Sequence, residues 1–260
     1  MINFTKFIKA PKNKKELSYL HRKYYDAVIW LVSSYNKLIL RSSKKNIPIL
    51  GDQEFDEIKN RSITPTDIND HLETIFTESL SVQPKLIVEL GVGAGESTFV
   101  FEKVAKLFGS NLVSIDLDNS SAGVSKLENW HFVSADDVEF ADNFKSWAFA
   151  HNIEPTIDIL FIDTSHRYEH TKTEIRKWFP FLSTGSKVFF HDSNVRTIYK
   201  RRGGTVGLAY DINRNVIRAI EDFFSTSFDE SKDFVGYLNG WLIKHFASCN
   251  GLTIIEKIQA

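Results

Sequence analysis

The chain has little of several residue types that would mark a specialised class of protein. Its 260 residues include one cysteine, Cys249, which excludes an internal disulfide framework or a zinc site built on several cysteines and is typical of a reducing compartment. The 32 lysines and arginines nearly balance the 33 aspartates and glutamates, so there is no basic excess for binding nucleic acid. There is one methionine against 21 phenylalanines. We expect these phenylalanines to fill core positions that leucine and methionine usually share.

A long uninterrupted apolar run is also absent. The longest apolar stretch, residues 24–40, contains Asp26 and Lys37 and is shorter than the ~20 residues that a bilayer requires. Residues 1–17 lack the apolar core and cleavage site of a secretory signal. We therefore expect a cytoplasmic protein with no stable membrane insertion. The basic residues of 1–23 form either a solvated arm or a contact with an anionic membrane surface.

From residue 85 onward, short apolar runs alternate with helical patterns. The apolar runs are 85–90, 111–116, 130–134, 157–163 and 187–192, and the helical patterns are 96–108, 137–150, 167–181 and 213–226. Because apolar strands joined through helices form parallel sheets covered on both faces, an α/β fold is predicted. Asn250-Gly251 is typical of a turn before a final strand at 252–258, so we expect an antiparallel hairpin at one edge.

The first part of the chain has a different pattern. Residues 1–80 show helical patterning interrupted by turn-like stretches at 41–46 and 61–67, so we divide the chain into a helical segment, 1–80, and a core, 81–260. We expect the helical segment to lie over the strand ends as a cap or lid and to set the choice of substrate. A subunit contact through it, and hence a homo-oligomer, is left open. The basic stretch with glycines at 200–204 is either a lid or a solvated loop.

A carboxylate stands at the end of every predicted parallel strand. These acids are Glu89, Asp116 with Asp118, Asp136 with Asp137, Asp163, and Asp192. The carboxyl ends of parallel strands share one edge of the sheet, which is where open α/β sheets bind ligands. Acids gathered there repel one another unless cations or hydrogen-bond donors compensate. Helix capping explains two or three of them, with Asp118 and Asp137 as the best candidates, and the others indicate a site.

The first strand runs into a glycine-rich turn, ELGVGAGE, at 89–96. Glycines there let backbone N–H groups approach a ligand closely. A dinucleotide-binding loop wants glycine or alanine at position 96, where this chain has Glu96, and this disfavours a NAD-dependent dehydrogenase. With an acid two residues before the first glycine, residues 85–260 resemble the class I S-adenosylmethionine-dependent methyltransferases.

The resemblance implies a Rossmann-like methyltransferase fold, with a mostly parallel seven-stranded sheet, an antiparallel edge hairpin and an N-terminal helical cap. It implies S-adenosylmethionine as the cofactor. The residues that it assigns to cofactor binding are Glu89, Gly91, Gly93, Gly95, Ser97, Asp116, Asp136 and Asp137. Among them, Asp116 would bind the ribose, because two carboxylate oxygens can accept both hydroxyls of a diol. Asp136, with Asp137 beside it, would lie near the adenine.

Two more segments carry a narrower resemblance. FIDTSHRYEH (161–170) and VFFHDSN (188–194) are similar to the macrocin and rhamnosyl O-methyltransferases and the cephalosporin-hydroxylase-type proteins. Thr164 stands where that subgroup usually has glycine. The resemblance implies that a divalent metal and a general base assist the reaction.

The metal, commonly Mg²⁺, is assigned by this resemblance to Asp163, His191 and Asp192. His191 takes a place often held by an acid, and imidazole shifts the preference toward softer ions than Mg²⁺. His166 matches the general base of sugar O-methyltransferases and, with Asp163, forms the catalytic pair. A metal lowers the pKa of a hydroxyl, and a histidine with a pKa near 6.5 can accept its proton at neutral pH. His170 is either a further site residue or a solvated helix position.

The leading hypothesis is an S-adenosylmethionine-dependent O-methyltransferase of natural-product biosynthesis. Its partner would be a small-molecule acceptor, the hydroxyl of a sugar or natural product, with divalent metal and a histidine base, and not a nucleic acid. An oxygenase-like relative on the same fold and a noncatalytic binding protein that keeps the cofactor fold are the alternatives.

Overall fold

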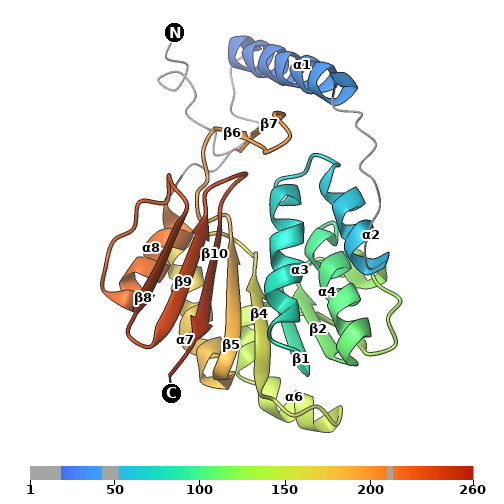
Figure 1. The fold of residues 1–260 in the computed structure, drawn as a ribbon, viewed down its shortest axis with the longest axis vertical. Helices are drawn as coiled ribbons and strands as arrows, with labels where there is room; N and C mark the ends of the chain where they lie inside the picture. Colours follow the sequence, from blue (N-terminus) through green and yellow to red (C-terminus); the bar gives the residue numbers. More distant parts are fainter. Residues whose placement is uncertain (1–18, 43–52, 210–212, 260) are drawn as a thin grey trace.

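The computed structural model describes residues 19–42, 53–209 and 213–259, so most of the basic N-terminal stretch lies outside the described residues. Within them, eight strands form one sheet in the order β3-β2-β1-β4-β5-β10-β9-β8, and β6 and β7 form a separate hairpin (Figure 1). The bounds are β1 Leu86–Leu90, β2 Asn111–Asp116, β3 Trp130–Ser134, β4 Ile157–Ile162, β5 Leu182–His191, β6 Ile198–Lys200, β7 Val206–Leu208, β8 Phe234–Leu238, β9 Trp241–Phe246 and β10 Leu252–Lys257.

The parallel part of the sheet follows the predicted apolar runs. β1 pairs in parallel with β2 and β4, and these pair in parallel with β3 and β5. Every residue of β1 is buried, as expected for a strand covered on both faces. β10 runs antiparallel to β5, and β9 and β8 continue the antiparallel pairing to the edge. The predicted α/β fold with an antiparallel edge is confirmed.

The edge has one strand more than the seven-stranded sheet that was predicted. The additional strand, β8, exposes 71% of Val235 and 55% of Tyr237. It gives no continuous apolar run in the sequence, because an edge strand alternates between the core and solvent. The helix predicted at 137–150 is two helices, α5 (Asp137–Ala141) and α6 (Phe144–Ala150).

Helices cover both faces of the sheet. One layer contains α2 (Gln53–Ser62), α3 (Leu72–Leu80) and α4 (Glu96–Phe108), and the other contains α5, α6, α7 (Tyr168–Trp178) and α8 (Asn215–Phe224). Successive strand residues point to opposite faces, so Phe189 packs in the first layer and its neighbour Phe190 in the second.

The predicted N-terminal cap, residues 1–80, is therefore divided in the structure. Ile58 of α2 and Leu72 and Phe76 of α3 are buried in the core of the first layer. The expectation that the whole segment lies over the strand ends is wrong for α2 and α3, because their apolar faces are covered by the sheet instead. None of the helices in the described ranges is long and apolar enough to cross a membrane.

The first helix, α1 (Tyr19–Ser42), lies beyond the carboxyl ends of the parallel strands, next to the β6–β7 hairpin (Figure 1). Asn36 Nδ2 donates to the carbonyl of Val206, and the Val206 N–H donates back to Asn36 Oδ1, each at 2.8 Å. Tyr35 Oη also donates to the carbonyl of Gly204 at 3.1 Å. This helix is the part of the predicted cap that stands over the strand ends.

The basic stretch before Gly203 is held against the core. Arg201 is only 7% exposed, and its guanidinium donates to the carbonyl of Thr66 and to Tyr199 Oη. The N–H of Arg202 donates to Asp70 at 2.7 Å. These contacts join the β6–β7 hairpin to the segment before α3. They anchor the stretch through Arg201 and the backbone of Arg202, while Lys200 and Arg202 are exposed.

Phenylalanines fill much of the core, as the composition predicted. Phe101 of α4 is fully buried, with its ring 5.4 Å from that of Phe161 and 6.4 Å from that of Phe189, in edge-to-face arrangements. Aromatic pairs of this kind add to the free energy gained from burial alone. Phe101 therefore links helix α4 to two central strands.

We predict that Phe101→Ala lowers the free energy of unfolding by about 3–5 kcal/mol, because it removes a large buried ring and leaves a cavity. Phe149→Ala is the control, since that side chain is 53% exposed, and it should change stability by less than about 1 kcal/mol. Urea unfolding followed by circular dichroism measures both. Equal losses in the two variants would contradict the described packing.

Candidate functional site

A cavity of about 380 Å³, here called the cofactor cavity, opens at the carboxyl ends of the parallel strands. Of the predicted site residues it brings together Gly91, Gly93, Asp116, Asp136, Asp137 and Asp163. Thr164, Ser165, Leu117 and His170 also line it. This is the edge where open α/β sheets bind ligands, so the strand-end acids have the expected position.

Gly91 lets the first loop approach the fourth strand closely. Its φ is +87°, and a Cβ atom there would lie 2.0 Å from the carbonyl oxygen of Asp163. Only glycine fits such a contact. Gly93 also has a positive φ, +51°, but a Cβ there would meet nothing within 4 Å, so its backbone borders open space at the cavity.

Asp116, at the end of β2, braces the glycine loop. Its Oδ2 accepts from the N–H groups of Val92 at 2.8 Å and Gly93 at 3.1 Å, and its Oδ1 accepts from Asp118 N at 2.8 Å. A carboxylate offers about four acceptor positions, so one remains for a ligand hydroxyl. The side chain therefore combines a structural role with a place on the cavity wall.

Glu89 does not line the cavity, contrary to its predicted role in cofactor binding. Its carboxylate is fully buried and accepts hydrogen bonds from Ser114 Oγ at 2.6 Å, Ser97 Oγ at 2.6 Å and Thr98 Oγ1 at 2.9 Å. Burial raises the pKa of Glu89 to about 7, although these hydroxyls oppose the shift. Glu89 thus fastens the start of α4 to the sheet.

Ser97 is correspondingly a partner of Glu89 and is 4% exposed, and Gly95 begins α4 with a φ of +82°. Neither is among the residues that line the cavity. Ser97 faces the buried carboxylate of Glu89, and a Cβ atom on Gly95 would lie 2.2 Å from Val124 Cγ1, so both have structural roles in this part of the fold.

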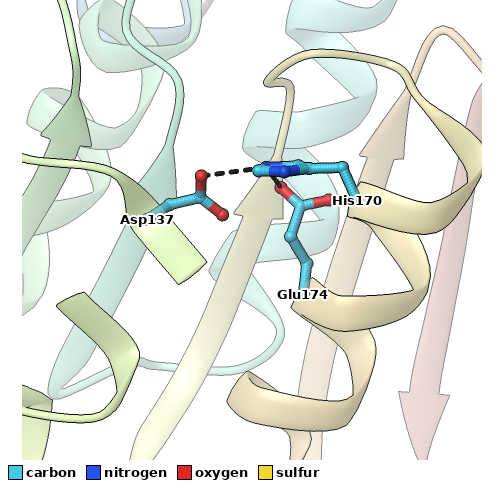
Figure 2. Close-up of side chains that lie close together, drawn as sticks. All are labelled: Asp137, His170 and Glu174. Carbon is cyan, nitrogen blue, oxygen red and sulfur yellow. Dashed lines mark hydrogen bonds and ion pairs between the residues drawn. The ribbon is translucent and has the colours of Figure 1, made fainter. Parts of the chain in front are cut away.

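For the two acids after β3, the structure differs from the expectation that Asp137 caps the helix. Asp136, not Asp137, caps α5: its Oδ1 accepts from the N–H groups of Val138 and Glu139, both at 3.0 Å. Asp137 is the first residue of the helix, and its carboxylate points at His170 (Figure 2). Both residues line the cofactor cavity.

A second cavity, of about 350 Å³ and here called the acceptor cavity, lies on the other side of the strand-end acids. Its wall includes His166, Asp192, Asp67, Tyr199, Asn213 and Asn250. Of these, only His166 and Asp192 were singled out in the sequence. Tyr199 lies in β6 and the others in loops. Their position near the strand ends depends on the tertiary fold, so local patterns carried no signal for them.

His166 and Asp163 join the two cavities. His166 Nε2 lies 2.8 Å from Asp163 Oδ1, and its Nδ1 lies 3.0 Å from Asp192 Oδ2. Asp163 lines the cofactor cavity, whereas His166 and Asp192 line the acceptor cavity. Both His166 and Asp192 have positive φ values, +51° and +55°, in a region that is costly for side-chain-bearing residues.

His191 contacts both Asp163 and Asp192, and its positive charge offsets their negative charges. Its Nδ1 is 3.1 Å from Asp163 Oδ1 and 3.3 Å from Asp192 Oδ1. Burial opposes a charge on His191, but Asp163 and Asp192 outweigh it and raise its pKa to about 10. Burial also opposes the charge on Asp163, yet His191 and His166 hold the pKa of that carboxyl well below its usual range.

The predicted metal ligands are close enough to share an ion. One ligand atom from each of Asp163, His191 and Asp192 lies within 4.8 Å of the others. Asp192 Oδ1 is buried without a hydrogen bond, and His191 Nε2 lies 3.3 Å from the carbonyl of Asp67. If Nε2–H of His191 donates to that carbonyl, Nδ1 of the neutral ring has its lone pair free to bind a metal. The three residues therefore fit a divalent ion.

Comparison with known proteins agrees with this fold. Residues 88–193 match the family model described as a methyltransferase domain. The uncharacterized protein y4gI of Sinorhizobium fredii (strain NBRC 101917 / NGR234) is 28% identical over 126 residues, which is 45% of this chain. The match spans only 14% of that longer protein.

Two solved structures share the fold. A methyltransferase from Geobacter sulfurreducens is 14% identical, with 82% of this chain and 93% of that chain covered and a TM-score of 0.50. Cofactor-bound Rv0187 from MTB is 13% identical, with 86% and 96% covered and a TM-score of 0.52. At such identities the likeness extends to the fold alone.

We predict that Glu89→Gln flattens the pH dependence of stability. Glu89 is protonated in both states below pH 4.5, but between about pH 4.5 and 7 only the unfolded chain loses the proton. The free energy of unfolding of the native chain should therefore fall through this window, by roughly 2–3 kcal/mol from this group. Urea unfolding at several pH values measures it, and parallel curves for the two proteins would refute the assignment.

Proposed function

We propose that this protein transfers a methyl group from S-adenosylmethionine to a hydroxyl of a small molecule, and the match of residues 88–193 to a methyltransferase-domain model supports this. The observation that carries the proposal is the direct contact between a residue that lines one cavity and a residue that lines the other. Asp163 on the cofactor side and His166 on the acceptor side are 2.8 Å apart. A methyl donor and a hydroxyl held on either side of this contact would be aligned for displacement.

The cofactor binds along the glycine loop in this proposal. The backbone of Gly91 and Gly93 forms the floor, and Asp116 accepts one ribose hydroxyl in addition to its three backbone donors. Asp136 lines the adenine side, where only one of its oxygens is used in capping α5. Acidic side chains around the cavity favour the sulfonium cation of the methyl donor.

His166 acts as the general base. Asp163 accepts from Nε2–H and so orients the ring, which leaves Nδ1 on the side of Asp192 and the acceptor cavity. Burial opposes a charge on His166, but the hydrogen bond to Asp163 and the charge of Asp192 raise its pKa. Because only the neutral ring accepts a proton, the transfer rate should rise as the pH increases through this raised pKa.

Asp163, His191 and Asp192 would hold a divalent ion, Mg²⁺ or a softer one. When bound, such an ion lowers the pKa of the acceptor hydroxyl. The polar wall of the acceptor cavity, with Asp67, Tyr199 and Asn250 among its residues, supports an acceptor with several hydroxyls, such as a sugar or a glycosylated natural product.

Calorimetry tests the cofactor. S-adenosylhomocysteine should bind the full chain with a stoichiometry of one, while NAD gives no heat, because Glu96 breaks the dinucleotide loop pattern. Failure to bind either S-adenosylmethionine or S-adenosylhomocysteine would overturn the proposal.

Formation of S-adenosylhomocysteine with a panel of glycosides and hydroxylated natural products tests the mechanism. His166→Gln should lower turnover by about 10²–10⁴-fold, the range for loss of a general base, with S-adenosylhomocysteine binding retained. Asp192→Asn and treatment with a chelator should abolish turnover. His151→Gln is the control, because that exposed side chain is outside both cavities. Near-normal turnover of His166→Gln would remove it as the base, and full activity in excess chelator would remove the metal.

A further inference from the structure

A second group of possible metal ligands lies beside the cofactor cavity, separate from the residues proposed for catalysis. It consists of Asp137, at the start of α5, and of His170 and Glu174, on successive turns of α7 (Figure 2). Because residues four apart on a helix share a face, His170 and Glu174 point the same way. We call these residues the Asp137–His170–Glu174 group.

The three side chains converge at ligand-like distances. His170 Nε2 lies 3.0 Å from Asp137 Oδ1 and 3.6 Å from Glu174 Oε1. One ligand atom from each residue lies within 4.8 Å of the others. With bonds of about 2.1 Å, two ligands of a tetrahedral ion are about 3.4 Å apart. The spacing therefore needs little change to accept an ion between the three atoms.

Burial gives an independent reason to expect a cation here. Glu174 is 0% exposed and Asp137 is 7% exposed. Asp137 Oδ2 and Glu174 Oε2 are buried without any hydrogen-bond partner. Thr164 Oγ1 donates to Glu174 Oε1 at 2.6 Å, but no lysine or arginine is among the partners described for either carboxylate. Buried carboxylates normally have a compensating charge.

Without an ion, protons must neutralise part of the negative charge of this group. Burial and the neighbouring charge of Asp137 raise the pKa of Glu174 to about 8. His170 is also surrounded by acids, since the hydrogen bond to Asp137 and the charges of Glu174 and Asp136 raise its pKa. A divalent ion would neutralise both carboxylates at once, with a neutral imidazole as the third ligand.

We propose that Asp137, His170 and Glu174 form a second divalent-cation site, of the zinc type, that ties α5 to α7 next to the cofactor cavity. One imidazole and two carboxylates suit Zn²⁺ better than Mg²⁺, which prefers oxygen ligands and keeps several waters. Asp137 and His170 line the cofactor cavity, so an ion can enter from there. The site does not depend on the catalytic roles proposed for His166 and Asp192.

Titration of the metal-free full chain with Zn²⁺ in a calorimeter tests the proposal. The background variant Asp192→Asn disables the other candidate site, and we expect it still to bind one Zn²⁺. Adding Glu174→Gln should weaken this binding at least about 100-fold. Loss of a residue that only hydrogen-bonds to a metal ligand costs up to about 100-fold, so a loss this large indicates a direct ligand. Adding Glu169→Gln is the matched control, because it removes the same charge from an exposed position of the same helix and should leave the affinity unchanged.

Two more readouts separate an ion site from a shared proton. In the Asp192→Asn chain, Co²⁺ should give visible absorption bands typical of low coordination number. These bands should disappear when either Glu174→Gln or His170→Asn is added. Two separate variants keep the test valid if one of them folds poorly. In the Asp192→Asn background, Zn²⁺ should raise the Tm of the chain that carries Glu169→Gln and not of the chain that carries Glu174→Gln. Absence of Zn²⁺ binding in the Asp192→Asn chain, or equal affinity in the Glu174→Gln and Glu169→Gln chains, would overturn the proposal.

Discussion

The site depends on the position of Asp163, where β4 ends against the glycine loop. Its N–H donates to the carbonyl of Leu90 at 2.9 Å, and its own carbonyl lies so close to Gly91 that no side chain fits there. Its carboxylate accepts from His166 and contacts His191. One residue thus fixes the distance between the loop that lines the cofactor cavity and the histidine that lines the acceptor cavity.

The acids at the strand ends each have a hydrogen-bonding or ion-pair partner, which explains how a nearly neutral chain can gather so many of them. Three kinds of partner are used: backbone N–H groups for Asp116, Asp118 and Asp136, hydroxyl groups for Glu89, and imidazoles for Asp137, Asp163 and Asp192. Backbone and hydroxyl donors are permanent parts of the fold. Imidazoles are exchangeable, because a metal can replace the proton that they share with a carboxylate. The proposed chemistry is therefore confined to the acids that have histidine partners.

Much of the fold could be predicted from the sequence, because a strand buried on both faces leaves a continuous apolar run. Helix α4 has the predicted bounds, 96–108, since Gly95 and Gly109 limit it at both ends. The site was harder to predict. Glu89 and Asp163 follow the same pattern of an acid near a strand end, but only the fold determines which side chain turns inward. No sequence pattern pointed to Glu174 as a possible metal ligand, because its partner Asp137 lies far away in the sequence.

A crystal structure of the chain with S-adenosylhomocysteine tests the central claim most directly. The account predicts that the ligand occupies the cofactor cavity, with a ribose hydroxyl on Asp116 and its sulfur toward the contact between Asp163 and His166. The acceptor cavity should remain open on the far side of that contact. An ordered ligand bound elsewhere on the protein, or with its sulfur turned away from Asp163, would contradict the account.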